Sequence, residues 1–132
     1  MPVDYSAEIR RLSALFSRNL PDSDEIAERL ERFDAAVLIA DDNACYVAVN
    51  TRAVVLTGYS VAELLTMTVP DLTPVPHGSE FRSLWRDFIR RGEQKGTYQL
   101  RRKDGSVILV RYAAWAGIAP NRHVTALRPD GG

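Results

Sequence analysis

The spacing of hydrophobic positions changes several times along the chain, and each change predicts a different element. Residues 7–20 repeat apolar side chains at helical spacing, and residues 24–33 do so again after the helix-breaking sequence Pro21-Asp22-Ser23. Both predicted helices are amphipathic, and their apolar stripes consist of Ile9, Leu12, Leu15, Phe16, Ile26, Leu30 and Phe33. Each stripe needs an apolar surface to cover.

Two later segments show the chemistry of β-hairpins. Residues 35–50 contain two short runs rich in Val, Ile and Tyr around Asp41-Asp42-Asn43, whose side chains favour turns. The sequence RRKDGSVILVRY, residues 101–112, contains Asp104-Gly105, and its glycine readily takes the positive φ of a tight hairpin turn. Around and after this second turn, strands are expected over residues 97–102, 106–115 and 123–127.

Helical signals separate the two hairpins. Asn50 is placed to cap a short helix over residues 51–57, and Ser60 begins a capping box before another short helix. Three prolines make residues 66–78 irregular, with at most one helical turn. The clearest helical pattern covers residues 79–91, where apolar side chains recur at i, i+3, i+4, i+7 and i+8: Phe81, Leu84, Trp85, Phe88 and Ile89.

The order of these elements predicts the fold class. Two strands, a block of short helices, one long helix and three strands give an α+β domain with a five-stranded antiparallel sheet. The short helices and the long helix would cover one face of this sheet, and the N-terminal amphipathic helices are additional. A chain of 132 residues is long enough for one such domain and its core.

Composition and charge narrow the function classes. The chain has 17 Lys and Arg against 17 Asp and Glu, so its net charge gives no support to nucleic-acid binding. Its apolar runs are far shorter than the ~20 residues that span a bilayer, and its N-terminus lacks the apolar core of a signal peptide. We therefore expect a cytoplasmic protein without membrane contact. The single cysteine, Cys45, excludes an internal disulfide and is interpreted as a small core or strand residue.

The sequence resembles the PAS (Per-Arnt-Sim) sensory domain at two motifs. VNTRAVVLTGYSVAEL, residues 49–64, is similar to the family's first helix and Gly-Tyr-Ser turn, and the basic Asp-Gly hairpin beginning at Leu100 is similar to its hairpin signature. The resemblance covers residues 34–128, which leaves 1–33 as a helical flank for dimerisation and signal coupling and 129–132 as a tail. It implies a sensor of a small molecule in bacterial-type signalling, such as two-component systems or transcription regulation.

The resemblance also implies where a ligand would lie, because in this family the long helix and the last three strands enclose a pocket. The last hairpin is apolar on both faces, so its own pattern leaves open which face points inward. The resemblance directs one set inward, and the expected ligand-binding residues are Leu38, Val54, Leu72, Trp85, Tyr98, Leu100, Ile108, Val110 and Tyr112. This set favours an uncoloured hydrophobic ligand, such as an acyl chain, or an empty pocket.

A homodimer is expected from the amount of apolar surface. The stripes within residues 1–33 exceed what one small sheet face can cover, and the outer sheet face needs a cover of its own. The predicted dimer interface consists of Ile9, Leu12, Leu15, Phe16, Leu109 and Trp115. The alternative is a monomer in which the helices fold back on their own subunit.

No cofactor is assigned. Flavin-binding members of the family carry a reactive cysteine within an Asn-Cys-Arg motif, where this chain has Thr68-Val69-Pro70, and this difference argues against flavin. Haem-binding members use a histidine on or just after the long helix. His77 lies just before that helix, which leaves a haem-binding gas or redox sensor as an alternative.

An enzyme is not predicted, because the sequence has no glycine-rich phosphate loop, metal-ligand cluster or catalytic triad. A small isomerase that uses Asp71 or Glu80 is one alternative, although both acids are explained as charges at helix ends. A ligand-free protein-interaction module is another. With no output domain in the sequence, we expect either a fragment of a larger signalling protein or a separate signalling partner.

Overall fold

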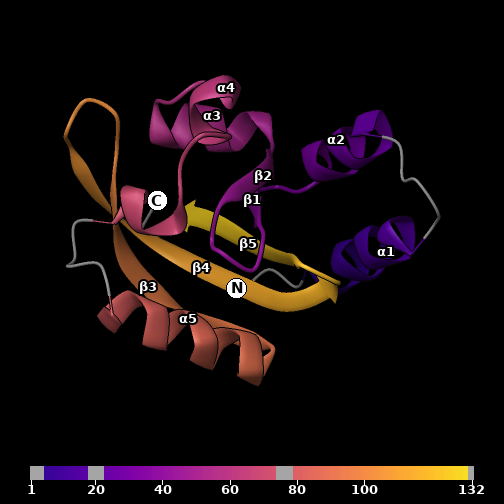
Figure 1. The fold of residues 1–132 in the computed structure, drawn as a ribbon. Helices are drawn as coiled ribbons and strands as arrows, with labels where there is room; N and C mark the ends of the chain where they lie inside the picture. Colours follow the sequence, from indigo (N-terminus) through magenta and orange to yellow (C-terminus); the bar gives the residue numbers. More distant parts are fainter. Residues whose placement is uncertain (1–4, 18–22, 74–78, 131–132) are drawn as a thin grey trace.

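The structure, a computed structural model, describes residues 5–17, 23–73 and 79–130 (Figure 1). Its helices are α1 (Ser6–Phe16), α2 (Ser23–Glu31), α3 (Thr51–Thr57), α4 (Val61–Leu64), the 3-10 helix η1 (Val69–Leu72) and α5 (Ser79–Arg91). Its strands are β1 (Ala36–Ala40), β2 (Tyr46–Val49), β3 (Glu93–Arg101), β4 (Val107–Ala119) and β5 (Arg122–Pro129). The α+β class is therefore confirmed. No helix within these described residues is long and apolar enough to cross a membrane.

The strands form one five-stranded sheet in the order β2-β1-β5-β4-β3, and every neighbouring pair is antiparallel. The first hairpin supplies β2 and β1, and the last three strands supply β5, β4 and β3. The two units join where β1 pairs with β5, with Leu38 opposite Thr125. The helical block between them must therefore cross the sheet, and it covers one face.

The two faces of the sheet carry different helices. Alternate strand residues point to opposite faces, and each set forms its own buried cluster. The inner face packs against α3, α4, η1 and α5, whereas the outer face packs against α1 and α2, which lie side by side and away from α5 in Figure 1. The inward direction assigned to the last hairpin is confirmed for Tyr98, Leu100, Ile108, Val110 and Tyr112.

One buried side chain joins the helices of both faces to the sheet. Asn50, only 1% exposed, accepts hydrogen bonds from the backbone N–H groups of Val37 and Ala53 at 2.9 and 3.0 Å. Its amide donates to the carbonyl oxygens of Leu30 and Ala35, both at 2.9 Å. The expected cap of α3 is therefore confirmed, and the same residue also ties the end of α2 to β1.

Several predicted strands are shorter than the observed ones. β3 begins at Glu93 rather than at residue 97. Its first residues pair with β4, but they are polar, so the hydrophobic pattern of the sequence did not indicate a strand there. β4 continues to Ala119 through an irregularity after Trp115, where Gly117 has a φ of 66°. Residues 18–20 of the predicted first helix lie outside the described residues.

Candidate functional site

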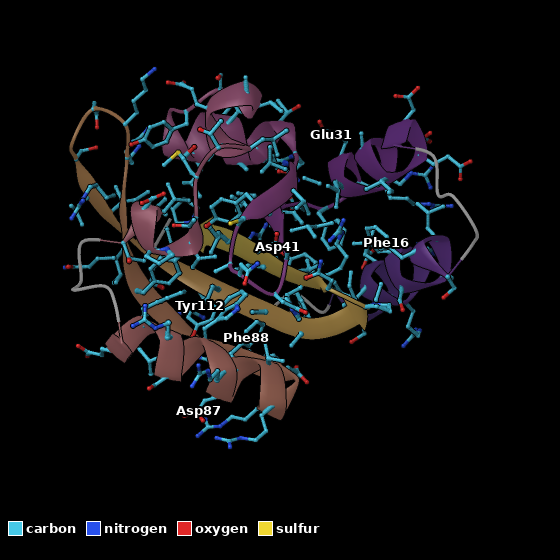
Figure 2. The ribbon with its side chains drawn as sticks, in the orientation of Figure 1. Phe16, Glu31, Asp41, Asp87, Phe88 and Tyr112 are labelled. Atoms are coloured by element: carbon cyan, nitrogen blue, oxygen red, sulfur yellow. The ribbon has the colours of Figure 1, made fainter. Side chains whose placement is uncertain are left out.

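A cavity of about 210 Å³ lies between α5 and the inner face of the sheet. Figure 2 shows Phe88 and Tyr112 in this space, one from the helix and one from the sheet. The lining side chains come from both hairpins, η1 and α5, and they are Leu38, Tyr46, Val69, Thr73, Phe81, Leu84, Trp85, Phe88, Gln94, Tyr98, Tyr112, Ala114, Thr125 and Leu127. No charged side chain is among these lining residues.

Aromatic rings of α5 form one wall of the cavity. The ring centroid of Trp85 lies 5.9 Å from that of Phe81 and 5.3 Å from that of Phe88. The indole N–H of Trp85 donates to the carbonyl oxygen of Asp42 at 2.9 Å, which fastens the helix to the β1–β2 turn. This wall is apolar toward the cavity and held by a polar contact at its edge.

The sheet supplies a wall with tyrosine hydroxyls. Tyr98 and Tyr112 make an edge-to-face pair with centroids 5.4 Å apart, and the amide of Gln94 donates to the Tyr112 hydroxyl at 2.7 Å. Gly96, the cross-strand partner of Tyr112, leaves room for this ring, because a Cβ there would lie 3.3 Å from it. Burial raises the pKa of Tyr98 and, together with Tyr98 and Asp71, that of Tyr46, so both stay protonated at neutral pH.

Four of the nine predicted ligand-binding residues line this cavity: Leu38, Trp85, Tyr98 and Tyr112. The other five do not. They belong to the inner cluster behind the wall, either fully buried (Leu72, Leu100 and Val110) or packed against it (Val54 and Ile108). The prediction took these inward apolar residues as ligand contacts, whereas α3, η1 and the sheet fill much of the interior with one another.

The prediction missed several wall residues. Phe81, Leu84 and Phe88 were recognised as parts of an apolar stripe, and the helical spacing that identified Trp85 would also have placed them on the wall. Tyr46 of β2 points inward, and the alternation of side chains in the first predicted hairpin could have indicated this direction. No sequence pattern pointed to Gln94 as a wall residue, because it lies in the part of β3 that was not predicted to be a strand.

The predicted dimer residues are placed mostly against the chain's own sheet. Their exposed fractions are 9% for Ile9, 0% for Leu12 and 4% for Leu15 in the single chain, and Phe16 and Trp115 are partly buried against the outer cluster. The N-terminal helices thus fold back on their own subunit, and most of the surplus apolar surface is covered there. Of the six, Leu109 is the well-exposed one, at 47%. The homodimer stays a prediction.

The residues considered for cofactors occupy different places. His77 lies outside the described residues. Both ring nitrogens of His123 are engaged, since the N–H of Gly117 donates to Nδ1 at 2.9 Å and Nε2 lies 2.8 Å from Asp42 Oδ1. Among the described residues there is no group of three or more His, Cys, Asp or Glu that could hold a metal ion. Val69 of the Thr68-Val69-Pro70 stretch lines the cavity.

The acids considered for an isomerase do not reach the cavity wall. Asp71 accepts a hydrogen bond from the backbone N–H of Thr68 at 2.9 Å, which explains it as a capping residue of η1. Glu80 lies exposed in the first turn of α5. Cys45 is half-buried beside the first hairpin turn, and its backbone forms an isolated bridge with Thr68.

A larger, charged cleft of about 750 Å³ lies near α3 and the end of β5. Its ionic groups already pair with one another, because Asp34 contacts Arg128 at 2.6 Å and Arg52 at 3.5 Å, and Arg111 contacts Asp130 at 3.0 Å. The smaller cavity has aromatic walls and no charged side chain among its lining residues. It is therefore the stronger candidate for a ligand site.

Comparisons with known proteins agree with this architecture. A family model described as PAS fold matches residues 24–114. The PAS domain of an HTR-like protein from Haloarcula marismortui is 17% identical with a TM-score of 0.70, covering 81% of this chain and 90% of that one. A PAS domain from a two-component sensor histidine kinase is 19% identical with a TM-score of 0.65, covering 81% and 95%.

A LOV protein shows the same fold. The Rhodobacter sphaeroides LOV protein is 17% identical with a TM-score of 0.67, and the match covers 82% of this chain and 66% of that one. At these identities the structural matches show the shared fold. No curated protein matches the sequence.

Proposed function

We propose that this chain, which belongs to the PAS family, is a sensory domain that binds a small molecule between α5 and the inner face of the sheet. The cavity of about 210 Å³ is the observation that carries this proposal. It opens beside an otherwise well-buried cluster, and the rings of Phe81, Trp85 and Phe88 form most of its helical wall.

A continuous series of contacts supports signal relay from this cavity to the N-terminal helices. The ring of His123 lies edge-on to Trp85 and Phe88, with centroids 5.6 and 6.2 Å away. The N–H of Gly117 donates to His123 Nδ1, and the carbonyl oxygen of the next residue, Ile118, accepts from the Ser13 hydroxyl of α1 at 2.6 Å. A ligand that displaces the wall would therefore change the position of α1.

Native mass spectrometry with an absorption spectrum tests the binding step on the full chain. We expect a bound small molecule, or uptake of an added one-ring aromatic probe, without a flavin or haem absorption band. The matched variant is Ala114→Leu, which fills the cavity from β4 and should abolish uptake. No uptake by either protein would refute the proposal, and a stoichiometric haem band lost in His77→Ala would favour the haem-sensor alternative.

Amide hydrogen exchange tests the relay. Ligand binding should change the exchange rates of α1, and Ser13→Ala should reduce that change while leaving ligand affinity within about twofold, because Ser13 lies on the outer face. Unchanged exchange in α1 with a saturated cavity would refute the relay. A homodimer would give the relay a second subunit to act on.

The proposal also includes a homodimer. Its interface would be smaller than the one expected from the apolar stripes of the N-terminal helices, because those stripes are mostly buried within the chain. Val107 and Leu109 are 44% and 47% exposed on the outer face of β4, where α1 and α2 do not cover it. Adjacent copies could bury these residues together with the half-buried Phe16. Sedimentation should show a dimer that Leu109→Asp dissociates, and a monomeric full-length chain would support the protein-interaction or purely monomeric alternatives.

A further inference from the structure

We infer that Asp42 is a positioning residue for the ligand cavity, because it holds the Trp85 wall from outside. Asn121 and His123 hold Asp42 in turn. None of these three holding residues is among those that line the cavity. The inference rests on the proposed ligand site and deepens it, since it names residues away from the ligand that determine how tightly the ligand is bound.

The indole of Trp85 fastens the helical wall by a directed contact. Its N–H donates to the carbonyl oxygen of Asp42 at 2.9 Å, at the exposed edge of the wall. Among the side chains of α5 that the structure describes, it is the one that hydrogen-bonds to another element. Ring packing against Phe81 and Phe88 tolerates a range of angles, whereas a hydrogen bond is directional, so the contact with Asp42 sets the direction of the indole.

Asp42 lies in the turn between β1 and β2, and two side chains hold it there. Its backbone N–H donates to Asn121 Oδ1 at 2.6 Å, and its carboxylate Oδ1 lies 2.8 Å from His123 Nε2. Both partners belong to the beginning of β5 and the turn before it, and β5 is the neighbour of β1 in the sheet. Asp42 is thus fixed through its backbone and its side chain, and so is the carbonyl oxygen that Trp85 uses.

The surroundings of His123 direct its ring proton at Asp42. The backbone N–H of Gly117 donates to Nδ1 at 2.9 Å, so that nitrogen carries no proton, and Nε2 is the one that donates to the carboxylate. The His123 side chain is 4% exposed and lies edge-on to Trp85, whereas the Asp42 side chain is 61% exposed. The buried imidazole is therefore the fixed member of the pair, and the exposed turn is the member that it restrains.

A wall that is held in place before binding favours the bound state. Without the contacts at Asp42, the turn and the indole would gain freedom, and ligand binding would have to restore their order, which lowers affinity. The side chains that touch the ligand would stay the same, because the changed residues do not line the cavity. Two results follow: a looser Trp85 indole in the ligand-free chain, and a weaker ligand complex.

Proton exchange of the two tryptophan indoles with water tests the first result on the full chain by NMR. Asp42→Ala removes the His123 contact, and Asn121→Gly removes the other while accommodating the φ of 61° at that position. Each should speed exchange of the Trp85 indole proton about threefold, and the double variant about tenfold. Trp115, in the outer cluster, is the internal reference for an intact fold, and its exchange should not change.

Titration with fluorobenzene, followed by fluorine NMR, tests the second result. Asp42→Ala and Asn121→Gly should each weaken binding about threefold, and the double variant about tenfold. Asp42→Asn is the rescue variant, because its amide oxygen keeps an acceptor for His123 Nε2, and its affinity should stay within about twofold of that of the unmodified chain.

Asp34→Ala is the matched control. Asp34 is 66% exposed and also pairs with a residue of β5, Arg128 at 2.6 Å, but it lines the charged cleft instead of the cavity. This variant should leave fluorobenzene affinity and Trp85 exchange unchanged.

Two substitutions of His123 separate its contacts. Glutamine reaches the position of Nε2 and can still donate to Asp42, whereas asparagine keeps an acceptor near the position of Nδ1 for Gly117 and ends short of Asp42. Both variants lose the ring contact with Trp85. His123→Gln should therefore bind fluorobenzene about threefold more tightly than His123→Asn does.

The outcomes separate this inference from the proposed function. Fluorobenzene affinity that is equal in the unmodified chain and the double variant would overturn the inference and leave the ligand site intact. So would an unchanged Trp85 exchange rate in the double variant, or a loss in Asp42→Asn as large as that in Asp42→Ala. If the unmodified chain does not bind fluorobenzene, the ligand site and the inference are both refuted.

Discussion

The two faces of the sheet are built from the same strands and yet differ in how completely they are filled. On the outer face, Leu12 of α1, Leu30 of α2 and Phe33 just after α2 are at most 2% exposed. On the inner face, the wall of α5 encloses a cavity of about 210 Å³ against β3 and β4. One face is therefore closely packed, and the other retains a cavity.

The side chains of the covering helices explain this difference. The stripe of α1 consists mostly of Ile and Leu, which adapt their rotamers to the sheet and leave little space. The stripe of α5 contains Phe81, Trp85 and Phe88, whose rigid rings contact one another and span the gap. These rings line the cavity, whereas the aliphatic stripe of α1 is almost fully buried.

The strongest test of the comparison is a residue that serves both faces. Asn50→Ala removes four hydrogen bonds. The carbonyl oxygens of Leu30 and Ala35 and the N–H of Val37 stay buried and lose their side-chain partner. We expect the free energy of unfolding to fall by about 4 kcal/mol, as measured by urea denaturation.

The control for this prediction is Asn50→Asp, which keeps the two acceptor contacts and loses the two donated ones. At pH 7 its buried carboxylate would face these two carbonyl oxygens without a counter-ion, so it should destabilise the chain at least as much as the alanine variant does. A loss below about 1 kcal/mol in the alanine variant would show that α2 and α3 are held by packing alone.

A matched pair of substitutions contrasts the two faces directly. Ala126 on the outer face and Ala114 on the inner face are 3% and 4% exposed, on neighbouring strands. Ala126→Leu should destabilise the chain by about 2 kcal/mol, because Ala126 is buried in the outer cluster, where added carbons must displace neighbouring side chains. Ala114→Leu should stabilise it by about 1 kcal/mol by filling the cavity.

Thermal or chemical denaturation of both variants measures the pair under the same conditions. The opposite signs are the essential result. If both leucines destabilise by similar amounts, the inner cavity is not available to added side chains, and the contrast between the faces fails.

The smallest expected effect concerns alkaline pH. Burial raises the pKa of Tyr98 far above its ordinary value of 10.0, whereas at Tyr5, on the outer face, the positive charge of Arg128 opposes the rise caused by burial. A raised pKa in the folded state stabilises it below pH 10, and this contribution is lost as the pH rises above 10.

Stability should therefore fall by about 1 kcal/mol between pH 10 and 11 because of Tyr98, and less because of Tyr5. Denaturation curves at pH 9, 10 and 11 measure this slope. Tyr98→Phe should flatten the curve more than Tyr5→Phe does. An equal flattening by both variants would show that the two faces bury their tyrosines alike.

Local signals in the sequence determined most of the elements. Asn50 caps α3, Gly58 ends it with a φ of 81°, and Ser60 with Glu63 forms the capping box of α4, because caps depend on neighbours within a few residues. The order of strands and helices, with its resemblance to PAS domains, was sufficient to predict the antiparallel sheet and the inward face of the last hairpin.

The tertiary structure alone decided which apolar residues face a cavity and which face each other. Leu100 and Trp85 are equivalent in a hydrophobic pattern, but the first is buried against η1 and the sheet, and the second lines open space. Likewise, Leu12 packs against the chain's own sheet, so its surface is not available to a second copy of the chain. Periodicity specifies the direction of a side chain, whereas the distance to the opposite wall depends on segments far away in the sequence.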